Sequence, residues 1–412
     1  MNSNLLRKIL IRMSILVASS ILGLFAVEFA TRVMIVPDRL GLQPSLAFRV
    51  NTNAANTMLR TNLDTDCTWL ENYSPSFRFG YTYRTSGECS IPGVDINGFM
   101  NRNPFPRARS SEVFSILVLG GSVAEAISDS QNAESSLLEH EFRTKYLGPM
   151  GQRIDVYSGA LGGWAVPNQE LVLMTFIQGF DAVIVYDGAN ELTRLKNAGA
   201  IGRPDPVNFS FRYDHSRLFD FEFAIVKLMR RLRHFGPLSR SYAWAGLQSL
   251  IETSAQDELF TKIGGESNIG HYADLPAPPS QTEIEIVDEN IQRYIRSVKN
   301  IFAMSKANGS LAIHFIQPIA GIAKPLTEAE KPFANYEGKE YYRRLESETL
   351  TALQGQESYS LIDLFKNESK TIYADRVHAG YFDGQSPGYT AMSDAIVKRA
   401  SKSWHLKPVT AN

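Results

Sequence analysis

Two short motifs of this 412-residue chain carry residue types that together can cleave an ester. Ser122 ends a Gly-Gly-Ser sequence, and Asp375 and His378 form an Asp-x-x-His sequence near the C-terminus. An imidazole can remove the proton of a serine hydroxyl, and a carboxylate can hold that imidazole in the required tautomer. The spacing of three allows one loop to carry both Asp375 and His378. Taken alone, each motif is common, and a plain turn or an incidental pair is its usual explanation.

Two residues between these motifs are suited to stabilising a negatively charged oxygen. Gly163 lies in a glycine-rich turn, and Asn190 belongs to a Gly-Ala-Asn-Glu sequence. Preorganised N–H donors stabilise the tetrahedral intermediate of acyl transfer. Together with the backbone N–H of Ser122, they predict an oxyanion hole. We expect no metal and no cofactor. The remaining histidines are interpreted as structural or surface residues: His140, His215, His234, His271, His314 and His405.

The sequence around these residues predicts an α/β fold. A nearly continuous apolar run that ends in two glycines precedes Ser122, and such a run is typical of a buried parallel strand. Apolar runs and helical spacings then alternate with short connections, which predicts a parallel sheet with Ser122 at its carboxyl edge. The expected strands are residues 114–119, 153–158, 182–186, 310–317 and 359–364. The expected helices are about 135–146, 168–178, 282–306 and 386–403.

Composition and patterning divide the chain into three parts. A hydrophobic content of 44% and a charged content of 21% are ordinary for a folded protein, and the formal net charge of −1 gives no reason to expect a nucleic-acid partner. We expect a membrane segment in residues 1–35, a linker and N-terminal extension in 36–110, and the catalytic domain in 111–403. Aromatic residues fall on every second position of residues 77–83, which is the period of a strand with one buried face.

The segment of about 195–281 fits the alternating pattern poorly, and we interpret it as an insertion in the catalytic domain. We expect it above the carboxyl edge of the sheet, where such folds bind ligands, so that it builds the substrate pocket. Its basic stretch, residues 227–234, could bind an anionic polymer or a membrane surface. A solvated helix face is the more common role of such a stretch, and we favour that interpretation.

The N-terminal segment predicts an uncleaved, single-pass signal anchor. Arg7, Lys8 and Arg12 precede an apolar stretch over residues 13–27, and the small-x-small pattern of a cleavage site is poorly matched after it. A cleaved signal peptide and a buried or amphipathic helix are the alternatives. Because basic residues stay on the cytoplasmic side, the catalytic body would be extracytoplasmic, either periplasmic or extracellular. Export would permit a disulfide between Cys67 and Cys89, whereas a reducing compartment would leave two free thiols.

The order of Gly-Gly-Ser122, Gly163, Asn190 and Asp375-x-x-His378 resembles the SGNH (GDSL-like) hydrolase superfamily, over roughly residues 110–195 and 283–403. The resemblance implies a flavodoxin-like, three-layer α/β/α sandwich. It implies that Ser122 is the nucleophile and His378 the base that Asp375 orients. It also implies an oxyanion hole formed by Ser122, Gly163 and Asn190. The chain departs from the usual Gly-Asp-Ser and Gly-x-Asn-Asp motifs, since it has a glycine before Ser122 and a glutamate after Asn190.

The resemblance implies a serine esterase that forms an acyl-enzyme. The expected substrates are O-acyl esters, above all O-acetyl esters of a cell-surface carbohydrate. The first alternative is an O-acyltransferase that modifies an extracytoplasmic polysaccharide, a role that similar anchored members fill. The second is an inactive anchored binding protein. We favour the esterase, because every catalytic residue type is present.

Overall fold

The computed structural model describes residues 73–76, 79–86, 90–91, 93–130, 134–196, 201, 282–334, 338–380 and 387–409. The N-terminal apolar segment, the pair Cys67 and Cys89, and most of the 195–281 insertion lie outside these ranges. The membrane anchor, the disulfide and the pocket built by the insertion therefore stay predictions. Across the described ranges, no helix is both long and apolar enough to cross a bilayer.

A five-stranded, wholly parallel sheet forms the centre of the fold and confirms the predicted fold class. The strands follow the spatial order β5 (Arg153–Ser158), β3 (Val113–Gly120), β6 (Ala182–Asp187), β7 (Leu311–Ile316) and β8 (Ser358–Ser360). The last strand is shorter than the expected 359–364. The Ser360 hydroxyl accepts the backbone N–H of Ile362, and a turn closes from Leu364 to Leu361, so the chain leaves the sheet early.

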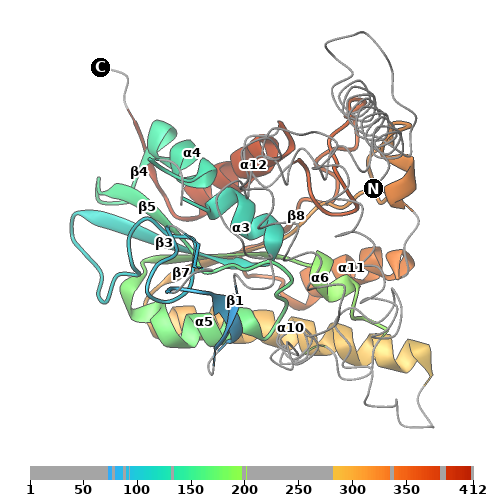
Figure 1. Ribbon diagram of the computed structural model, residues 1–412, viewed down its shortest axis with the longest axis horizontal. Coiled ribbons are helices and arrows are strands. Elements are labelled where there is room, and N and C mark those ends of the chain that lie inside the picture. Colours follow the sequence, from blue (N-terminus) through green and yellow to red (C-terminus); the bar gives the residue numbers. More distant parts are fainter. Residues whose placement is uncertain are drawn as a thin grey trace, which may run out of the picture. The chain divides into compact units, whose positions relative to one another are not determined.

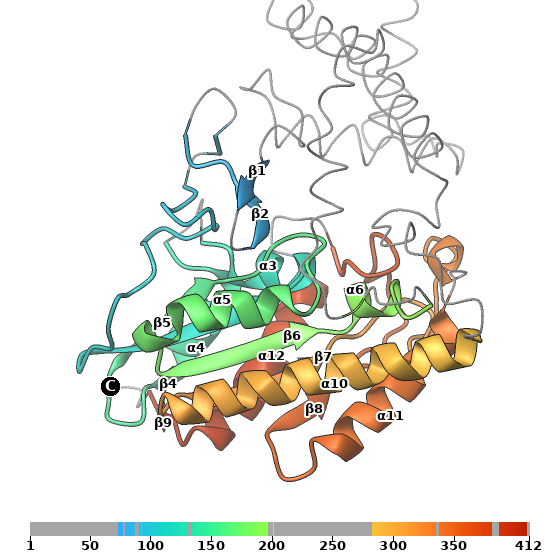
Figure 2. The ribbon, with the colours of Figure 1, turned by 90° about the horizontal axis from the view of Figure 1, so that it is seen from below.

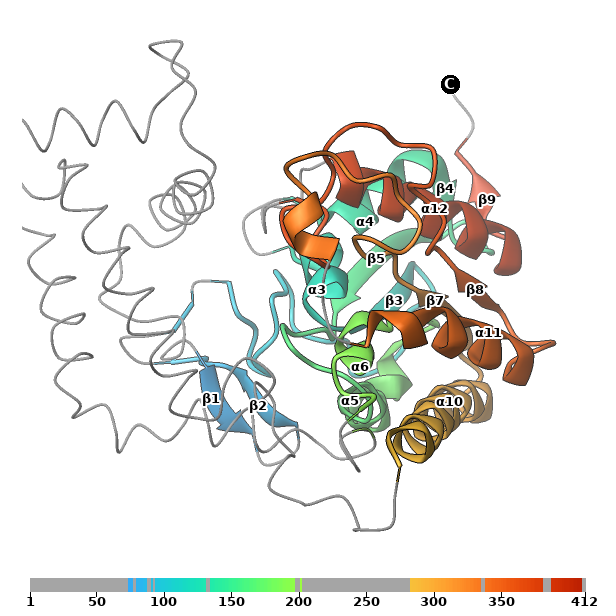
Figure 3. The same ribbon diagram turned by 90° about the vertical axis from the view of Figure 1, so that its right-hand side faces the viewer.

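Helices cover both faces of the sheet, as a parallel sheet requires. Alternate side chains of β3 enter different cores: Ile116 and Val118 pack on one face, and Leu117 and Leu119 on the other. Figures 1 and 3 show the three layers. The first face is covered by α3 (Ser122–Ser128), α4 (Leu137–Lys145) and α12 (Pro387–Ser403), and the second by α5 (Asn168–Phe176), α10 (Glu283–Ala307) and α11 (Tyr342–Ala352).

The long helix α10 lies beside α5 across the second face (Figure 2). Its start is defined by a capping box. The Thr282 hydroxyl accepts the N–H of Glu285 at 3.3 Å, and the Glu285 carboxylate accepts the N–H of Thr282 at 2.8 Å. This reciprocal pair satisfies two of the backbone donors that a helix start leaves unpaired. The observed bounds of α10, Glu283–Ala307, confirm the expected helix of 282–306 to within a residue.

The aromatic segment before the sheet forms a small antiparallel hairpin, β1 (Tyr73–Ser76) with β2 (Gly80–Tyr83). Tyr81 and Tyr83 are buried, and so is Thr82 between them, so this short strand is covered on both faces and not on the one face that the sequence period predicts. Tyr81 packs edge-on against Trp164, whose ring is fully buried. A second short pair, β4 (Tyr146–Leu147) with β9 (Lys407–Pro408), joins the end of α4 to the C-terminal residues.

The strand order creates the place where chemistry is expected. Strands β3, β5, β6, β7 and β8 follow one another in the chain, but β3 lies between β5 and β6, so the connections run in opposite directions from β3. Ligands of open α/β sheets bind at such a switch point, outside the carboxyl ends of the strands. Ser122 follows β3, and Asn190 follows β6 in the short helix α6 (Ala189–Leu192). The switch point therefore brings Ser122 and Asn190 to the same edge of the sheet.

Candidate active site

Ser122, His378 and Asp375 form one hydrogen-bonded chain. His378 Nε2 lies 2.7 Å from Ser122 Oγ, and His378 Nδ1 lies 2.6 Å from Asp375 Oδ2. These are the contacts that a base needs to accept the serine proton and to have its tautomer held. The His378 side chain is 14% exposed, and Ser122 is partly exposed, so these hydrogen-bonded side chains lie at the surface of the domain.

The loop that carries Asp375 and His378 is held by the same carboxylate. Asp375 Oδ1 accepts the backbone N–H groups of Val377 and His378, both at 2.8 Å, while Oδ2 faces the imidazole. Burial would raise the pKa of Asp375, but the hydrogen bonds and charge of His378 and the two N–H donors outweigh it. The pKa lies below its usual value. The carboxylate is thus ionised where it can stabilise an imidazolium.

A buried ion pair anchors the start of this loop, and sequence reasoning did not find it. The Lys324 ammonium lies 2.6 Å from Glu330, and both side chains are at most 1% exposed. The other oxygen of Glu330 accepts the N–H groups of Ile372 and Tyr373 at 2.8 and 2.9 Å. Burial opposes ionisation of Glu330, but Lys324 and these donors prevail and lower its pKa to about 2. The segment leading into Asp375 is therefore fixed by charge-assisted hydrogen bonds.

Two backbone N–H groups are available to a substrate oxygen. Ser122 is the first residue of α3, and the first N–H groups of a helix have no partner inside it. Neither the Ser122 N–H nor the Gly163 N–H donates to any residue that the structure describes. Gly163 adopts a φ of +80°, which favours glycine, and its carbonyl accepts from the buried Arg194 at 2.9 Å.

The Tyr81 hydroxyl orients the peptide that contains the Gly163 N–H. It donates to the carbonyl of Gly162 at 2.7 Å from a fully buried ring. Because a trans peptide is planar, fixing the Gly162 carbonyl also fixes the direction of the Gly163 N–H on the other side of the plane. The N-terminal hairpin is thereby tied to the predicted oxyanion hole.

Tyr81→Phe is expected to lower kcat for an ester by about 10-fold with little change in KM, because one neutral hydrogen bond is lost. Steady-state kinetics on a short p-nitrophenyl ester would measure this. The matched control is Tyr359→Phe. Tyr359 lies on the edge strand β8 and its hydroxyl donates to Glu357, so its loss should leave kcat unchanged. Equal rates for Tyr81→Phe and the unchanged protein would contradict this role of the hydroxyl.

Asn190 lies close to the nucleophile, with its amide held by the neighbouring turn. Asn190 Nδ2 donates to the carbonyl of Trp164 at 2.6 Å. An amide nitrogen carries two hydrogens, so this bond leaves one free to donate elsewhere. Asn190 is partly exposed, as are Gly163 and Ser122. The three predicted oxyanion donors thus border the accessible edge of the sheet.

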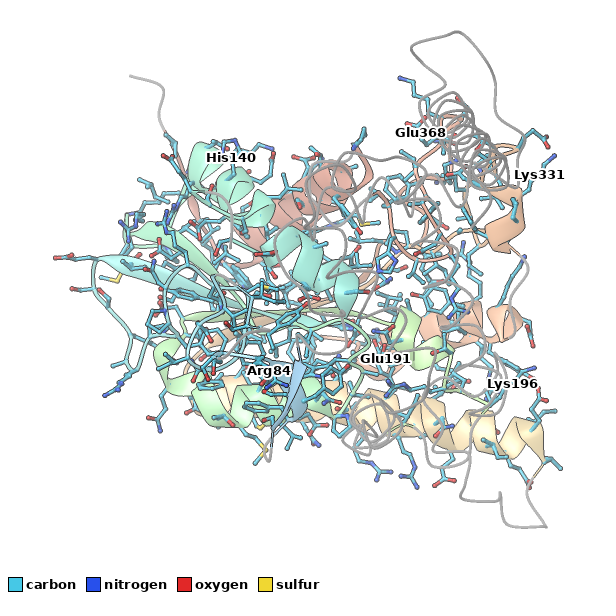
Figure 4. The ribbon with its side chains drawn as sticks, in the orientation of Figure 1. Arg84, His140, Glu191, Lys196, Lys331 and Glu368 are labelled. Atoms are coloured by element: carbon cyan, nitrogen blue, oxygen red, sulfur yellow. The ribbon has the colours of Figure 1, made fainter. Side chains whose placement is uncertain are left out.

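Glu191 joins the two turns that carry Gly163 and Asn190. Its carboxylate is 1% exposed, and its two oxygens accept the N–H groups of Val166 at 3.0 Å and Gly188 at 2.8 Å. Figure 4 shows Glu191 on α6. Burial, with the charge of Asp187 nearby, raises the pKa of Glu191 to about 7 against the opposing backbone hydrogen bonds. Glu191, which stands where the usual Gly-x-Asn-Asp motif has an aspartate, is thus a buried carboxyl group that links two turns and has an elevated pKa.

This elevated pKa predicts a pH-dependent stability. Between pH 4.5 and about 7, the folded protein holds a proton on Glu191 that the unfolded chain has lost, so the free energy of unfolding falls as pH rises. Each pKa unit corresponds to about 1.4 kcal/mol, so the contribution should change by about 3 kcal/mol across this window. Urea unfolding of wild type and Glu191→Gln should show a stability difference that shrinks by that order from pH 5 to pH 7.5. A pH-independent difference, like that of the exposed control Glu328→Gln, would refute the elevated pKa.

His314 occupies a structural position in the core. His314 is fully buried on β7, with Nδ1 2.8 Å from Ser358 Oγ and Nε2 2.9 Å from the Tyr294 hydroxyl. The Tyr294 hydroxyl in turn donates to Asp187 at 2.5 Å. This network joins β6, β7, β8 and α10 inside the core. No cluster of three or more potential ligands for a metal ion occurs within the described ranges.

Comparison with known proteins finds similarity at the level of structure alone. The chain matches no protein-family model and no curated protein. A catalytic mutant of an acetylxylan esterase from Geobacillus stearothermophilus aligns with 74% of this chain and 100% of its own, at 12% identity and a TM-score of 0.36. A lipase/acylhydrolase from Enterococcus faecalis aligns with 72% and 99%, at 12% identity and a TM-score of 0.34. These similarities concern the fold, and at this level they carry no argument about the activity or substrate of this chain.

Proposed function

We propose that the protein is a serine esterase of the SGNH type that cleaves O-acyl esters through a covalent acyl-enzyme. The observation that carries the proposal is the continuous chain from Ser122 Oγ through His378 to Asp375, with contacts of 2.7 and 2.6 Å. Its position at the switch point of a parallel sheet, beside three N–H donors, supports the same chemistry. An inactive binding protein would have no need to keep this geometry.

In the proposed reaction, Ser122 Oγ attacks the ester carbonyl carbon while its proton passes to His378 Nε2. The carbonyl oxygen becomes an oxyanion, which the N–H groups of Ser122 and Gly163 and the amide of Asn190 stabilise. The bond to the alcohol breaks as His378 returns the proton to the departing oxygen, and an acyl-serine remains. His378 then removes a proton from water, the hydroxide attacks the acyl carbon, and the free acid leaves as Ser122 recovers its proton.

The proposed substrate is an O-acetyl ester of a carbohydrate. This choice rests on the resemblance of the four motifs to those of the SGNH superfamily. The test is to incubate the protein with an O-acetylated oligosaccharide and with a deacetylated acceptor of different mass. Acetate release that is lost in Ser122→Ala, with the acceptor mass unchanged, is the expected result. Acceptor that gains an acetyl group would instead identify an O-acyltransferase. Absence of both products, with a short p-nitrophenyl ester still cleaved, would exclude the carbohydrate substrate and retain the esterase.

A further inference from the structure

Gly121, the residue before Ser122, has no room for a side chain. A Cβ atom built there would lie 2.1 Å from Asn190 Nδ2 and 3.1 Å from the carbonyl oxygen of Trp164. Its φ is −96°, a value open to every L-residue, so the backbone conformation does not require glycine at this position. The Asn190 amide, rather than the turn, is what excludes a side chain at residue 121.

The same contact places the Asn190 amide beside the nucleophile. Since a Cβ lies about 1.5 Å from its Cα, Asn190 Nδ2 is within about 4 Å of the Gly121 Cα, one peptide away from Ser122. The hydrogen bond from Nδ2 to the Trp164 carbonyl, at 2.6 Å, holds the amide in this space. A side chain at residue 121 could be accommodated only by moving the amide, because the Trp164 carbonyl also crowds the site.

We propose that Gly121 is a positioning residue, whose missing side chain admits the Asn190 amide to the oxyanion site. The inference rests on the proposed esterase function. In this chain the space of a side chain at residue 121 is occupied by the catalytic amide. Gly121 acts only through Asn190 and touches neither the substrate nor the reacting atoms.

A double-mutant cycle on a short p-nitrophenyl ester tests the proposal. Asn190→Ala should lower kcat by about 10² to 10³-fold, the usual cost of one oxyanion donor. Gly121→Ala should lower kcat by at least about 10-fold with little change in KM, because the displaced amide still leaves the substrate pocket intact. The double variant should be about as slow as Asn190→Ala alone, since the amide nitrogen that the new methyl group would meet most closely is already absent.

The control for crowding alone is Gly148→Ala. A Cβ at Gly148 would meet Gln152 Oε1 at 2.5 Å and Phe114 Cβ at 2.8 Å, in a turn before β5. This variant should change thermal stability but not kcat. Thermal unfolding of all variants would identify any that fail to fold.

Two kinetic results would overturn the proposal. One is a Gly121→Ala variant as active as wild type. The other is a Gly121→Ala loss that is equally large in the Asn190→Ala background, which would mean that the methyl group disturbs Ser122 itself. A crystal structure of Gly121→Ala provides the independent test: the Asn190 amide should leave the Trp164 carbonyl. This readout holds even if wild type cleaves no ester and the proposed function fails, and an amide that keeps its position would refute the proposal by itself.

Discussion

Replacing His378 by alanine is expected to lower kcat for a short p-nitrophenyl ester by on the order of 10⁵-fold. The reason is geometric. His378 Nε2, the proposed base, lies 2.7 Å from Ser122 Oγ, and without a base the hydroxyl keeps its proton and is a weak nucleophile. In the proposed reaction the imidazole also returns that proton to the leaving alcohol, so its removal should affect both halves of the reaction. Steady-state kinetics under saturating substrate would measure the loss.

His140→Ala is the matched control for this substitution. His140 is exposed on α4 and is shown in Figure 4. We expect wild-type kcat from that variant. Substantial activity in His378→Ala would mean that another group acts as the base and would contradict a catalytic role for the contact between His378 and Ser122.

Asp375→Asn is expected to lower kcat by on the order of 10⁴-fold while the fold is preserved. The amide oxygen of asparagine can still accept the N–H groups of Val377 and His378, which Asp375 Oδ1 accepts at 2.8 Å. The amide nitrogen, however, would replace Asp375 Oδ2 and donate toward His378 Nδ1. That contact selects the tautomer in which Nε2 carries the hydrogen, so the ring can no longer accept the proton of Ser122.

Two further variants separate this effect from a loss of structure. Asp375→Ala removes the backbone contacts as well, so it should lower both kcat and the melting temperature, whereas Asp375→Asn should lower kcat alone. Asp394→Asn, at an exposed position paired with Lys145, should change neither kcat nor the melting temperature by much. If Asp375→Asn retained more than a tenth of wild-type kcat, Asp375 would be a structural residue of the loop and not the partner of the base.

The elements that position Ser122 could be predicted because their signals are local. The apolar run of β3 and the two glycines after it lie within ten residues of Ser122, and the period of the pattern identifies a buried parallel strand. The pairing of Asp375 with His378 is equally local. The spacing of three lets one carboxylate accept hydrogen bonds from both the imidazole ring and the backbone N–H of His378. The predicted strand at residues 359–364 was too long because the Ser360 hydroxyl favours a turn over continuation of the strand.

The groups that hold the site in place could not be predicted, because their partners are distant in the sequence. Tyr81 reaches Gly162 across 81 residues, and Glu330 reaches Ile372 across 42. Nothing in the sequence near either residue distinguishes it from an ordinary core tyrosine or surface glutamate. The role of Glu191 is closer to the motif, but its burial and its bond to Val166 depend on how two strands meet at the sheet edge. Such contacts become visible only when the sheet is assembled.

The central claim is that Ser122 is an activated nucleophile, and covalent labelling with a fluorophosphonate tests it most directly. The reagent phosphonylates an activated serine hydroxyl and spares ordinary ones, and peptide mass spectrometry identifies the residue that carries the label. We expect stoichiometric labelling of Ser122 in wild type, none in Ser122→Ala, and strongly slowed labelling in His378→Ala. Labelling of another residue, or no labelling of folded wild-type protein, would contradict the account.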